Sequence, residues 1–484
     1  MLRDDLGGDP VALSPGRGQV LLRMLHLTDL HIMDAGSPAR SDWVEARADD
    51  RKWHPLLHMA RPHDLLGNWG SVQFSRAIRE AGADAADMAI FTGDNIDNAQ
   101  RNELDAFVAL GNGGSFGFPY EGPQRSWWAE DVRSGDPLHR THDGLWPFWL
   151  PEGGAADRFR VRFGFPVVPG LVDAAASTVS LDGIGIPWIS AVGNHDVMRQ
   201  GTVFTTAELE AVAVGNWRAL GGPPGFDPVD PIASYLAEPA LYVKGEPRFE
   251  VVADHRRRAV DRAEFIRAHI ESDGPGFGSV ESADYVYDTE HVRVVVLDTN
   301  HPTGHYQGSI GLSQLAWLDA RLREAVDRPV VVASHHGSVS LENTYGNADP
   351  TDRRLAADLE AVLLRYGNVV AWLVGHRHVH RIRPLPNPQT GRPGLWEITT
   401  SSVIDWPCQI RRVEIVLGSD GSVGVHTEVL DHDSFQTSRG SLDDASLAAW
   451  HREIALNTER AYSIRFREGK PSDRNTYLAR PAVR

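Results

Sequence analysis

Five short polar blocks, each directly after an apolar run, contain the residues of this sequence that are best suited to chemistry. They are rich in Asp, His and Asn, which bind divalent metal ions through carboxylate oxygen, imidazole nitrogen and amide oxygen atoms. The blocks are Asp29-Leu30-His31, Gly93 to Asn98, Gly193 to Asp196, His335-His336-Gly337 and Gly375 to His378. The apolar runs are typical of buried strands, whose carboxyl ends place loop residues around one site. The pattern therefore predicts a dinuclear metal site.

No single block is specific enough to carry this prediction. A pair such as Asp29 and His31 occurs by chance at many strand-end turns, and Gly-Asp after an apolar run is equally weak. Five blocks of suitable composition, each at the end of a predicted strand, are not expected by chance. The set as a whole therefore carries the prediction.

The order of the blocks resembles the calcineurin-like metallophosphoesterase family, whose motifs are D-x-H, G-D-x-x-D/N, G-N-H-D/E, H-x-P or similar, and G-H-x-H. The resemblance covers roughly residues 20–430. It implies three ligands for each ion and one bridging carboxylate. One ion would be held by Asp29, His31 and His378. The other would be held by Asn194, His335 and His376, with Asp94 as the bridge.

The resemblance also implies a mechanism for phosphate ester hydrolysis. A bridging carboxylate holds two ions about 3.5–4 Å apart, which suits in-line attack on phosphorus by a water or hydroxide between them. His195, next to a predicted ligand, is the candidate general acid or charge-stabilising residue. Asp196 is expected either to orient His195 through a hydrogen bond or to cap the turn.

Several neighbouring residues have more than one interpretation. Family spacing favours His335 over His336 as the ligand. Asp97 and Asn98 are expected to brace their loop through side-chain to backbone hydrogen bonds, and Asn98 is also a weaker candidate for direct or indirect contact with a metal ion. His380 is expected at the surface or behind the ligands. Other weak candidates for substrate contact, each with a structural alternative, are Arg377, Arg256 to Arg258, and Trp127, Trp128, Trp146 and Trp149.

Alternating strands and helices must position these blocks. The predicted strands are 21–27, 88–92, 187–192, 292–297, 329–333, 369–374, 395–400, 411–417 and 423–430, and the predicted helices are 72–82, 206–220, 312–325, 353–366 and 441–456. Glycines at 418 and 421 indicate an antiparallel hairpin between the last two strands.

This order predicts an α/β fold, an α/β/β/α sandwich of two mixed sheets flanked by helices, with the metal site at the strand ends. We expect an N-terminal segment at 1–19, the metallophosphoesterase domain at 20–430, and a C-terminal helical tail at 431–484. Stretches 99–185 and 221–285 are too long for plain connections, so we expect them to be inserts that flank the site.

Composition narrows the class of protein. The formal net charge of −17, from 48 basic and 65 acidic residues, disfavours binding to extended nucleic acid but is compatible with a small phosphate ester at a metal site. No apolar run is long enough to cross a membrane. The polar start lacks the pattern of a secretory signal and favours a cytoplasmic location, with a longer natural start left open. The single cysteine, Cys408, excludes an intramolecular disulfide.

We therefore expect an enzyme that hydrolyses a phosphomonoester or phosphodiester, nucleotide-type substrates included, with two ions of manganese, iron or zinc. A metallo-β-lactamase-like hydrolase is disfavoured because the sequence has no His-x-His-x-Asp-His run. The alternative from a different class is a non-catalytic metal-binding interaction module that keeps this fold. Neither the substrate nor the oligomeric state follows from the sequence.

Overall fold

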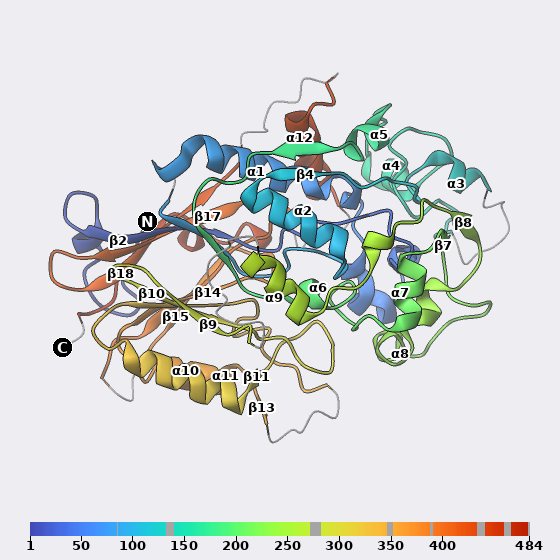
Figure 1. Cartoon of the computed structure of the whole chain (residues 1–484). Helices are drawn as coiled ribbons and strands as arrows, with labels where there is room; N and C mark the ends of the chain where they lie inside the picture. Colours follow the sequence, from blue (N-terminus) through green and yellow to red (C-terminus); the bar gives the residue numbers. More distant parts are fainter. Residues whose placement is uncertain are drawn as a thin grey trace.

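Two mixed β-sheets pack face to face, and helices cover both outer faces (Figure 1). The computed structural model describes residues 1–84, 86–131, 140–271, 282–345, 352–387, 391–432, 441–458 and 466–482. The predicted α/β/β/α sandwich of mixed sheets is confirmed. No helix among these described residues has the length and apolar character needed to span a membrane.

The first sheet has seven strands in the order β1-β19-β18-β17-β2-β3-β6. Their bounds are β1 Leu2–Arg3, β2 Gln19–Leu27, β3 Met88–Phe91, β6 Trp188–Ser190, β17 Ile410–Leu417, β18 Val423–Leu430 and β19 Thr476–Leu478. The first three blocks follow β2, β3 and β6, which run parallel, so these blocks emerge at one edge of the sheet. Strands β17 and β18 form the predicted antiparallel hairpin.

The second sheet has six strands in the order β15-β16-β14-β12-β10-β9. Their bounds are β9 Tyr285–Asp288, β10 Arg293–Leu297, β12 Val330–Ser334, β14 Val369–Val374, β15 Arg381–Leu385 and β16 Leu395–Thr399. The four central strands are parallel, and β9 and β15 close the edges antiparallel. Strands β12 and β14 are entirely buried, as their continuous apolar sequences require, and the last two blocks follow them.

The helices form the two outer layers. α1 Gly67–Ala81, α2 Arg101–Asn112 and α12 Asp444–Leu456 lie over the first sheet, and α10 Leu312–Glu324 and α11 Ala356–Leu363 lie over the second (Figure 1). The main core includes Val72 of α1 and Phe107 of α2 together with strand residues of both sheets. A second core packs α10 and α11 against the outward side chains of β10, β12 and β14.

A smaller lobe lies beside the strand-end edge. It has its own aromatic core, which draws on segments within residues 43–59, 128–150 and 203–251. The core includes Trp128 and Trp146, whereas Trp149 belongs to the main core. Segments of both predicted inserts therefore contribute to this lobe, together with the 3₁₀ helix η3 Arg51–Met59.

Two local predictions were wrong. The helix predicted over 206–220 ends early: α7 spans Ala207–Ala213, and Trp217–Ala219 forms β7, which pairs with β8 Arg248–Glu250. The helix predicted over 353–366 is shorter in the structure: α11 spans Ala356–Leu363, because Arg353–Arg354 forms the short strand β13. Both errors arise where a strand pairing with a distant segment overrides local helical spacing.

Candidate metal centre

All five polar blocks meet at one end of the sandwich. The first three lie at the carboxyl ends of β2, β3 and β6, and the last two follow β12 and β14. Both sheets therefore contribute to the site. Potential ligand atoms lie within 4.8 Å of one another in overlapping groups: Asp29, His31 and His378; His31, Asp94 and His195; Asp29, Asp94 and His335; and His335, His336 and His376.

The backbone of this site is unusual. Five of the predicted ligands have positive φ angles: Asp29 at 52°, His31 at 47°, Asp94 at 51°, His376 at 67° and His378 at 50°. Non-glycine residues adopt this left-handed conformation at a free-energy cost, and such residues cluster at functional sites.

Glycines let the loops approach closely. A Cβ on Gly193 would lie 2.1 Å from the Asp94 backbone nitrogen, and one on Gly375 would lie 2.0 Å from the Thr28 hydroxyl oxygen. The glycines that precede the ligands are therefore required by space, independently of their backbone angles.

Asp29, His31 and His378 form one half of the site. His378 Nε2 lies 3.1 Å from Asp29 Oδ1. Each ring is fixed from behind by a carboxylate: His31 Nδ1 is 2.9 Å from Asp97 Oδ1, and His378 Nδ1 is 2.6 Å from Asp405 Oδ2. A carboxylate behind an imidazole sets its orientation and makes the opposite nitrogen a better ligand.

Asp94 occupies the centre of the site. Its Oδ2 lies 3.1 Å from His335 Nε2 and 3.8 Å from His31 Nε2, while Oδ1 accepts a 2.8 Å hydrogen bond from the His195 backbone N–H. One carboxylate therefore faces an imidazole from each predicted ligand set.

The donor atoms fit a metal site. His31 Nε2 and Asn194 Oδ1 are buried and have no hydrogen-bond partner. Asn194 Nδ2 donates to the Gly201 carbonyl at 3.0 Å, which leaves the amide oxygen as the unpartnered atom. Buried polar atoms are rarely left unpaired in proteins, and the unpaired atoms here are of the kinds that coordinate metal ions.

The hydrogen-bond partners of the adjacent residues His335 and His336 show which of the two faces the other predicted ligands. His335 Nδ1 is 2.8 Å from the Thr92 carbonyl, so its Nε2 faces Asp94 and lies 3.2 Å from His376 Nδ1. His336 instead uses both ring nitrogens in protein contacts, at 2.9 Å to the Thr299 hydroxyl and 3.0 Å to the Tyr306 carbonyl. His335 is therefore the histidine whose Nε2 faces the other predicted ligands.

The carboxylate beside His195 belongs to Asp97, and not to Asp196, which was one of two roles expected for Asp196. Its Nδ1 lies 3.0 Å from the Asp97 carbonyl oxygen and 3.1 Å from Asp97 Oδ1. Asp196 instead accepts backbone hydrogen bonds from Asn95, Ile96 and Gly193. The structure thus gives Asp196 the turn-capping alternative, and Asp97 is the carboxylate beside His195.

Two further expectations need correction. The Asp97 carboxylate contacts the side chains of His31, His195 and Arg40, so its role is not limited to bracing its own loop. His380 is neither exposed nor behind a ligand: its buried ring contacts Gln409 and Arg411.

The electrostatics of the site follow from its buried carboxylates. Burial lowers the pKa of His335, but Asp94 outweighs this effect and raises it to about 9. Burial also lowers the pKa of His195, and Asp94 and Asp97 together raise it above its usual value. Without metal ions these carboxylates favour the protonated forms of the two histidines. Bound cations would compete with the proton on His335, which is a predicted ligand.

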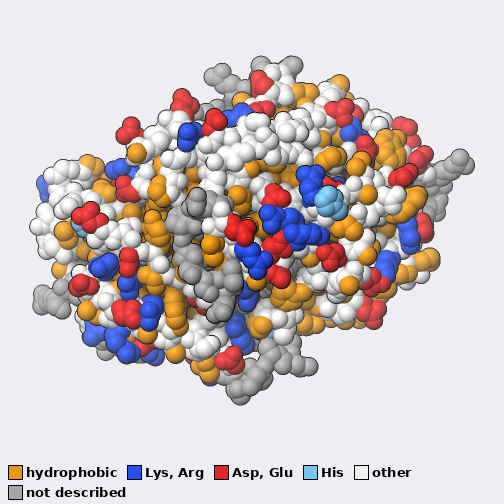
Figure 2. Space-filling view, viewed as in Figure 1, with side chains coloured by type: hydrophobic (Ala, Val, Ile, Leu, Met, Phe, Trp, Pro, Cys, Tyr) orange, Lys and Arg blue, Asp and Glu red, His pale blue; other side chains and the backbone are white. Residues whose placement is uncertain are grey.

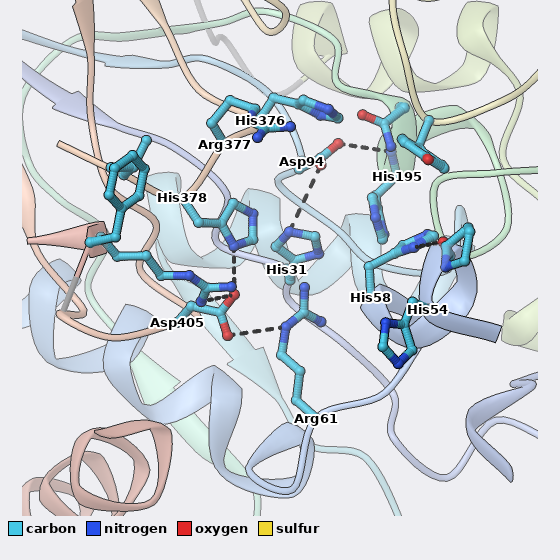
Figure 3. Close-up of a pocket in the computed structure, with 16 residues that line it drawn as sticks. His31, His54, His58, Arg61, Asp94, His195, His376, Arg377, His378 and Asp405 are labelled. Carbon is cyan, nitrogen blue, oxygen red and sulfur yellow. Dashed lines mark hydrogen bonds and ion pairs between the residues drawn. The ribbon is translucent and has the colours of Figure 1, made fainter. Parts of the chain in front are cut away.

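A cavity of about 390 Å³ opens over the site (Figure 3). It is lined by predicted site residues and by several residues that the motifs did not identify: His54, His58, Arg61, Tyr306, Asp405, Phe466 and Arg467. Arg377 lines it as well. Asp405 follows the apolar pair Val403-Ile404, which is a sequence signal of the same kind as the other blocks, but a lone Asp is too common to identify.

The basic cluster Arg256 to Arg258 lies outside this cavity. Arg257 is buried against Asp34, while Arg256 pairs with Asp254 and Arg258 with Glu264. Acidic and basic side chains are interspersed on the face that carries α9 Arg262–Glu271 (Figure 2). The cluster is therefore a set of ion pairs.

Three phosphodiesterases show sequence similarity to the chain. The glycerophosphodiester phosphodiesterase GpdQ of Enterobacter lignolyticus is 26% identical over 187 residues, which cover 38% of this chain and 62% of that protein. A cAMP/cGMP dual specificity phosphodiesterase of Mycobacterium tuberculosis is 32% identical over 31% of this chain and 41% of its own length. A protein named probable cyclic nucleotide phosphodiesterase, from Rhodococcus erythropolis, is 34% identical over 38% of this chain and 49% of its own length.

The similarity is partial, because the chain spans between 41% and 62% of the length of these relatives. No protein-family model matches the chain. The five motif blocks nevertheless converge on one buried cluster of His and Asp side chains at the strand ends of an α/β/β/α sandwich. The order of the motif blocks and the site they form resemble those of the calcineurin-like metallophosphoesterase family, and the chain is similar in sequence to three proteins named as phosphodiesterases.

Proposed function

We propose that the protein hydrolyses phosphate esters with two metal ions, and that phosphodiesters are its main substrate class. The observation that carries this proposal is the position of Asp94 Oδ2, which faces His335 Nε2 at 3.1 Å and His31 Nε2 at 3.8 Å. A carboxylate between two imidazoles from separate ligand sets suits a bridge between two cations.

Each ion has its own proposed ligand set. Asp29, His31 and His378 would hold one ion. Asn194, His335 and His376 would hold the other, and Asp94 would be shared. When bound, the ions would polarise the phosphoryl oxygens and supply an activated water for attack on phosphorus. Mixed nitrogen and oxygen donors suit manganese, iron or zinc.

His195 is the proposed general acid. Asp97 holds its Nδ1 side, which directs Nε2 to the substrate, and the nearby carboxylates raise its pKa, which favours the protonated ring. A protonated imidazole at this position donates to the departing ester oxygen. Asp196 supports the reaction indirectly, by holding together the two loops that carry Asp94 and His195.

The relatives favour diesters over monoesters. The names of all three describe phosphodiesterases, and two of the names specify cyclic nucleotides. The net charge of −17 disfavours long polyanions, so we propose a small diester of the nucleotide or glycerol type. A cytoplasmic location remains part of this proposal.

The test is hydrolysis of bis(p-nitrophenyl) phosphate and p-nitrophenyl phosphate by protein loaded with manganese, iron or zinc. We expect release of p-nitrophenolate, with the diester preferred. Asp94→Asn should abolish metal binding and activity, and His195→Ala should lower kcat by about 10²–10⁴-fold with metal content retained. His291→Ala, a half-exposed histidine before β10, is the matched control and should change neither quantity.

A different result would favour the alternative. If the metal-loaded protein hydrolyses neither ester, and Asp94→Asn removes the metal without any catalytic consequence, the chain is a metal-binding interaction module.

A further inference from the structure

The charges on the cavity wall are unequal. Apart from the predicted ligands and the histidines His54, His58 and His195, the charged side chains that line it are Arg61, Arg377, Arg467 and Asp405. Arg61 lies deep in the wall, 3.3 Å from Asp405, 3.7 Å from Asp64 and 3.9 Å from Asp97, so nearby carboxylates balance its charge. Of the other two arginines, Arg377 has no carboxylate partner among the described residues, and Arg467 shares Asp405 with Arg61.

Arg377 is the cation without a partner. It lies between the predicted ligands His376 and His378, is exposed, and lines the cavity. Within the part of the chain that the structure describes, its guanidinium forms no hydrogen bond or ion pair. In Figure 3 it lies beside His376 and His378. Its charge is available to an anion in the cavity.

Arg467 lies on the same side of the site. Its Nη1 is 2.6 Å from Asp405 Oδ2, and the same oxygen lies 2.6 Å from His378 Nδ1. Asp405 also pairs with Arg61 and His63, so one carboxylate is shared by two guanidinium groups and two imidazoles. Because Asp405 is shared in this way, it does not fully neutralise Arg467. Arg467 is linked to the predicted ligand His378 through Asp405.

This side lies away from His195. The His31 ring lies between the rings of His195 and His378 (Figure 3). Its centroid is 4.4 Å from that of His195 and 5.3 Å from that of His378. The leaving group must lie at His195 if His195 protonates it. In an in-line displacement the attacking water lies opposite the leaving group, and the retained substituent projects sideways from phosphorus. On the side of His378 such a substituent would meet Arg377 and Arg467, away from the leaving group.

Apolar surface accompanies these two arginines. Phe466 precedes Arg467, is 71% exposed and lines the cavity together with Val379. An exposed aromatic ring beside a guanidinium suits a ligand that combines a flat or apolar body with an anionic group.

We propose that the enzyme selects phosphodiesters whose retained substituent carries a second anionic group, a phosphate or a carboxylate, which Arg377 and Arg467 bind. This inference rests on the proposed function. It identifies Arg377 and Arg467 as specificity-determining residues and gives the substrate a total charge of at least −2.

The test compares thymidine 5′-(p-nitrophenyl phosphate) with the same diester phosphorylated at O3′, so that the reacting phosphate and the leaving group are identical. We expect metal-loaded wild-type protein to prefer the 3′-phosphorylated diester by about tenfold or more in kcat/KM, the scale of a charge-assisted hydrogen bond. Arg377→Gln should remove this preference, mainly through a higher KM for the phosphorylated diester.

Two further variants sharpen the test. Arg467→Gln should also reduce the preference, and metal analysis must show that the ion held through His378 is still bound. Arg323→Gln alters an arginine whose side chain is 70% exposed on α10 and should leave both substrates unaffected.

The contrary outcomes separate this inference from the proposed function. If wild type releases p-nitrophenolate equally from both diesters, or if the preference survives both substitutions, the anion subsite is wrong and the hydrolase function stands. If Arg377→Gln impairs p-nitrophenyl phosphate as strongly as the phosphorylated diester, Arg377 binds the reacting phosphate, which also overturns the subsite. If no ester is hydrolysed, calorimetry with thymidine 3′,5′-bisphosphate and thymidine 5′-phosphate decides: tighter binding of the bisphosphate that depends on Arg377 supports the subsite, and equal binding refutes it.

Discussion

At the scale of single residues, Asp97 is the side chain with the most consequences that the motifs did not predict. It accepts from His31 Nδ1, lies 3.1 Å from His195 Nδ1 and pairs with the buried Arg40. Asp97→Asn keeps the shape but removes the charge that stabilises both rings. We expect kcat to fall by about 100-fold or more while the fold is kept. Asp327→Asn, at a site that is 76% exposed, is the control, and a change in kcat below about twofold for Asp97→Asn would refute the role.

Glu103 gives a pH dependence of stability. Its buried carboxyl accepts backbone hydrogen bonds from Asp34 and Asn98, and burial, followed by the charge of Asp97, raises its pKa from 4.5 to about 7. Between these two pH values the folded protein keeps a proton that the unfolded chain has released, so Glu103 makes stability fall as the pH rises. Its contribution is complete below pH 4.5 and lost above 7.

Glu103→Gln removes this ionisation. We expect the difference in unfolding free energy between pH 4.5 and pH 8 to change by about 3 kcal/mol relative to wild type, because each pKa unit corresponds to about 1.36 kcal/mol. Denaturant titrations at the two pH values measure it. If the free energy of unfolding of wild type and variant changes with pH in the same way, Glu103 has the same pKa in the folded and the unfolded chain.

The ligand types were predictable from the sequence, but their partners were not. Asp29, His31 and the other predicted ligands follow recognisable strands, so composition and position sufficed to group them. The support of His378 by Asp405, and the use of both His336 nitrogens by Thr299 and Tyr306, depend on loops that meet only in the folded chain. Local pattern carries no information on such contacts.

At the scale of elements, predictability followed burial. Strands such as β12 and β14 are buried along their whole length, so their apolar sequences identify them. The short strands β7 and β13 were missed because they exist only through pairing with distant segments. Helix α12 was predicted, but its packing against α1 was not, since helical spacing identifies an apolar face without its partner.

The packing of α12 can be tested on one helix. Ile454 is 1% exposed and belongs to the main core, whereas Leu456 is 39% exposed. We expect Ile454→Ala to lower the free energy of unfolding by about 2–5 kcal/mol and Leu456→Ala by less than about 1 kcal/mol. Chemical denaturation measures both. Equal effects would mean that α12 does not contribute to the core as the structure shows.

At the scale of the whole molecule, the metal centre joins the two sheets. Asp29, Asp94 and Asn194 follow strands of the first sheet, and His335 and His378 follow strands of the second. The chain ends join the same architecture, because β1 pairs with β19 at the edge of the first sheet. The sandwich was predictable from the alternation of elements, but this pairing joins residues far apart in the sequence and has no local signal.

A ligand set that spans both sheets predicts that metal ions stabilise the entire fold. Without cations the site holds buried carboxylates, unpartnered donor atoms and five residues in strained left-handed conformations. Ions that bind only the folded chain should add about 2.7 kcal/mol when free metal exceeds the Kd a hundredfold. Calorimetry of chelator-treated protein, with and without added manganese or zinc, should therefore show a higher Tm with metal. Asp94→Asn should lose this response and His291→Ala should keep it; a Tm independent of metal in the wild type would show that the two sheets hold together without the ions.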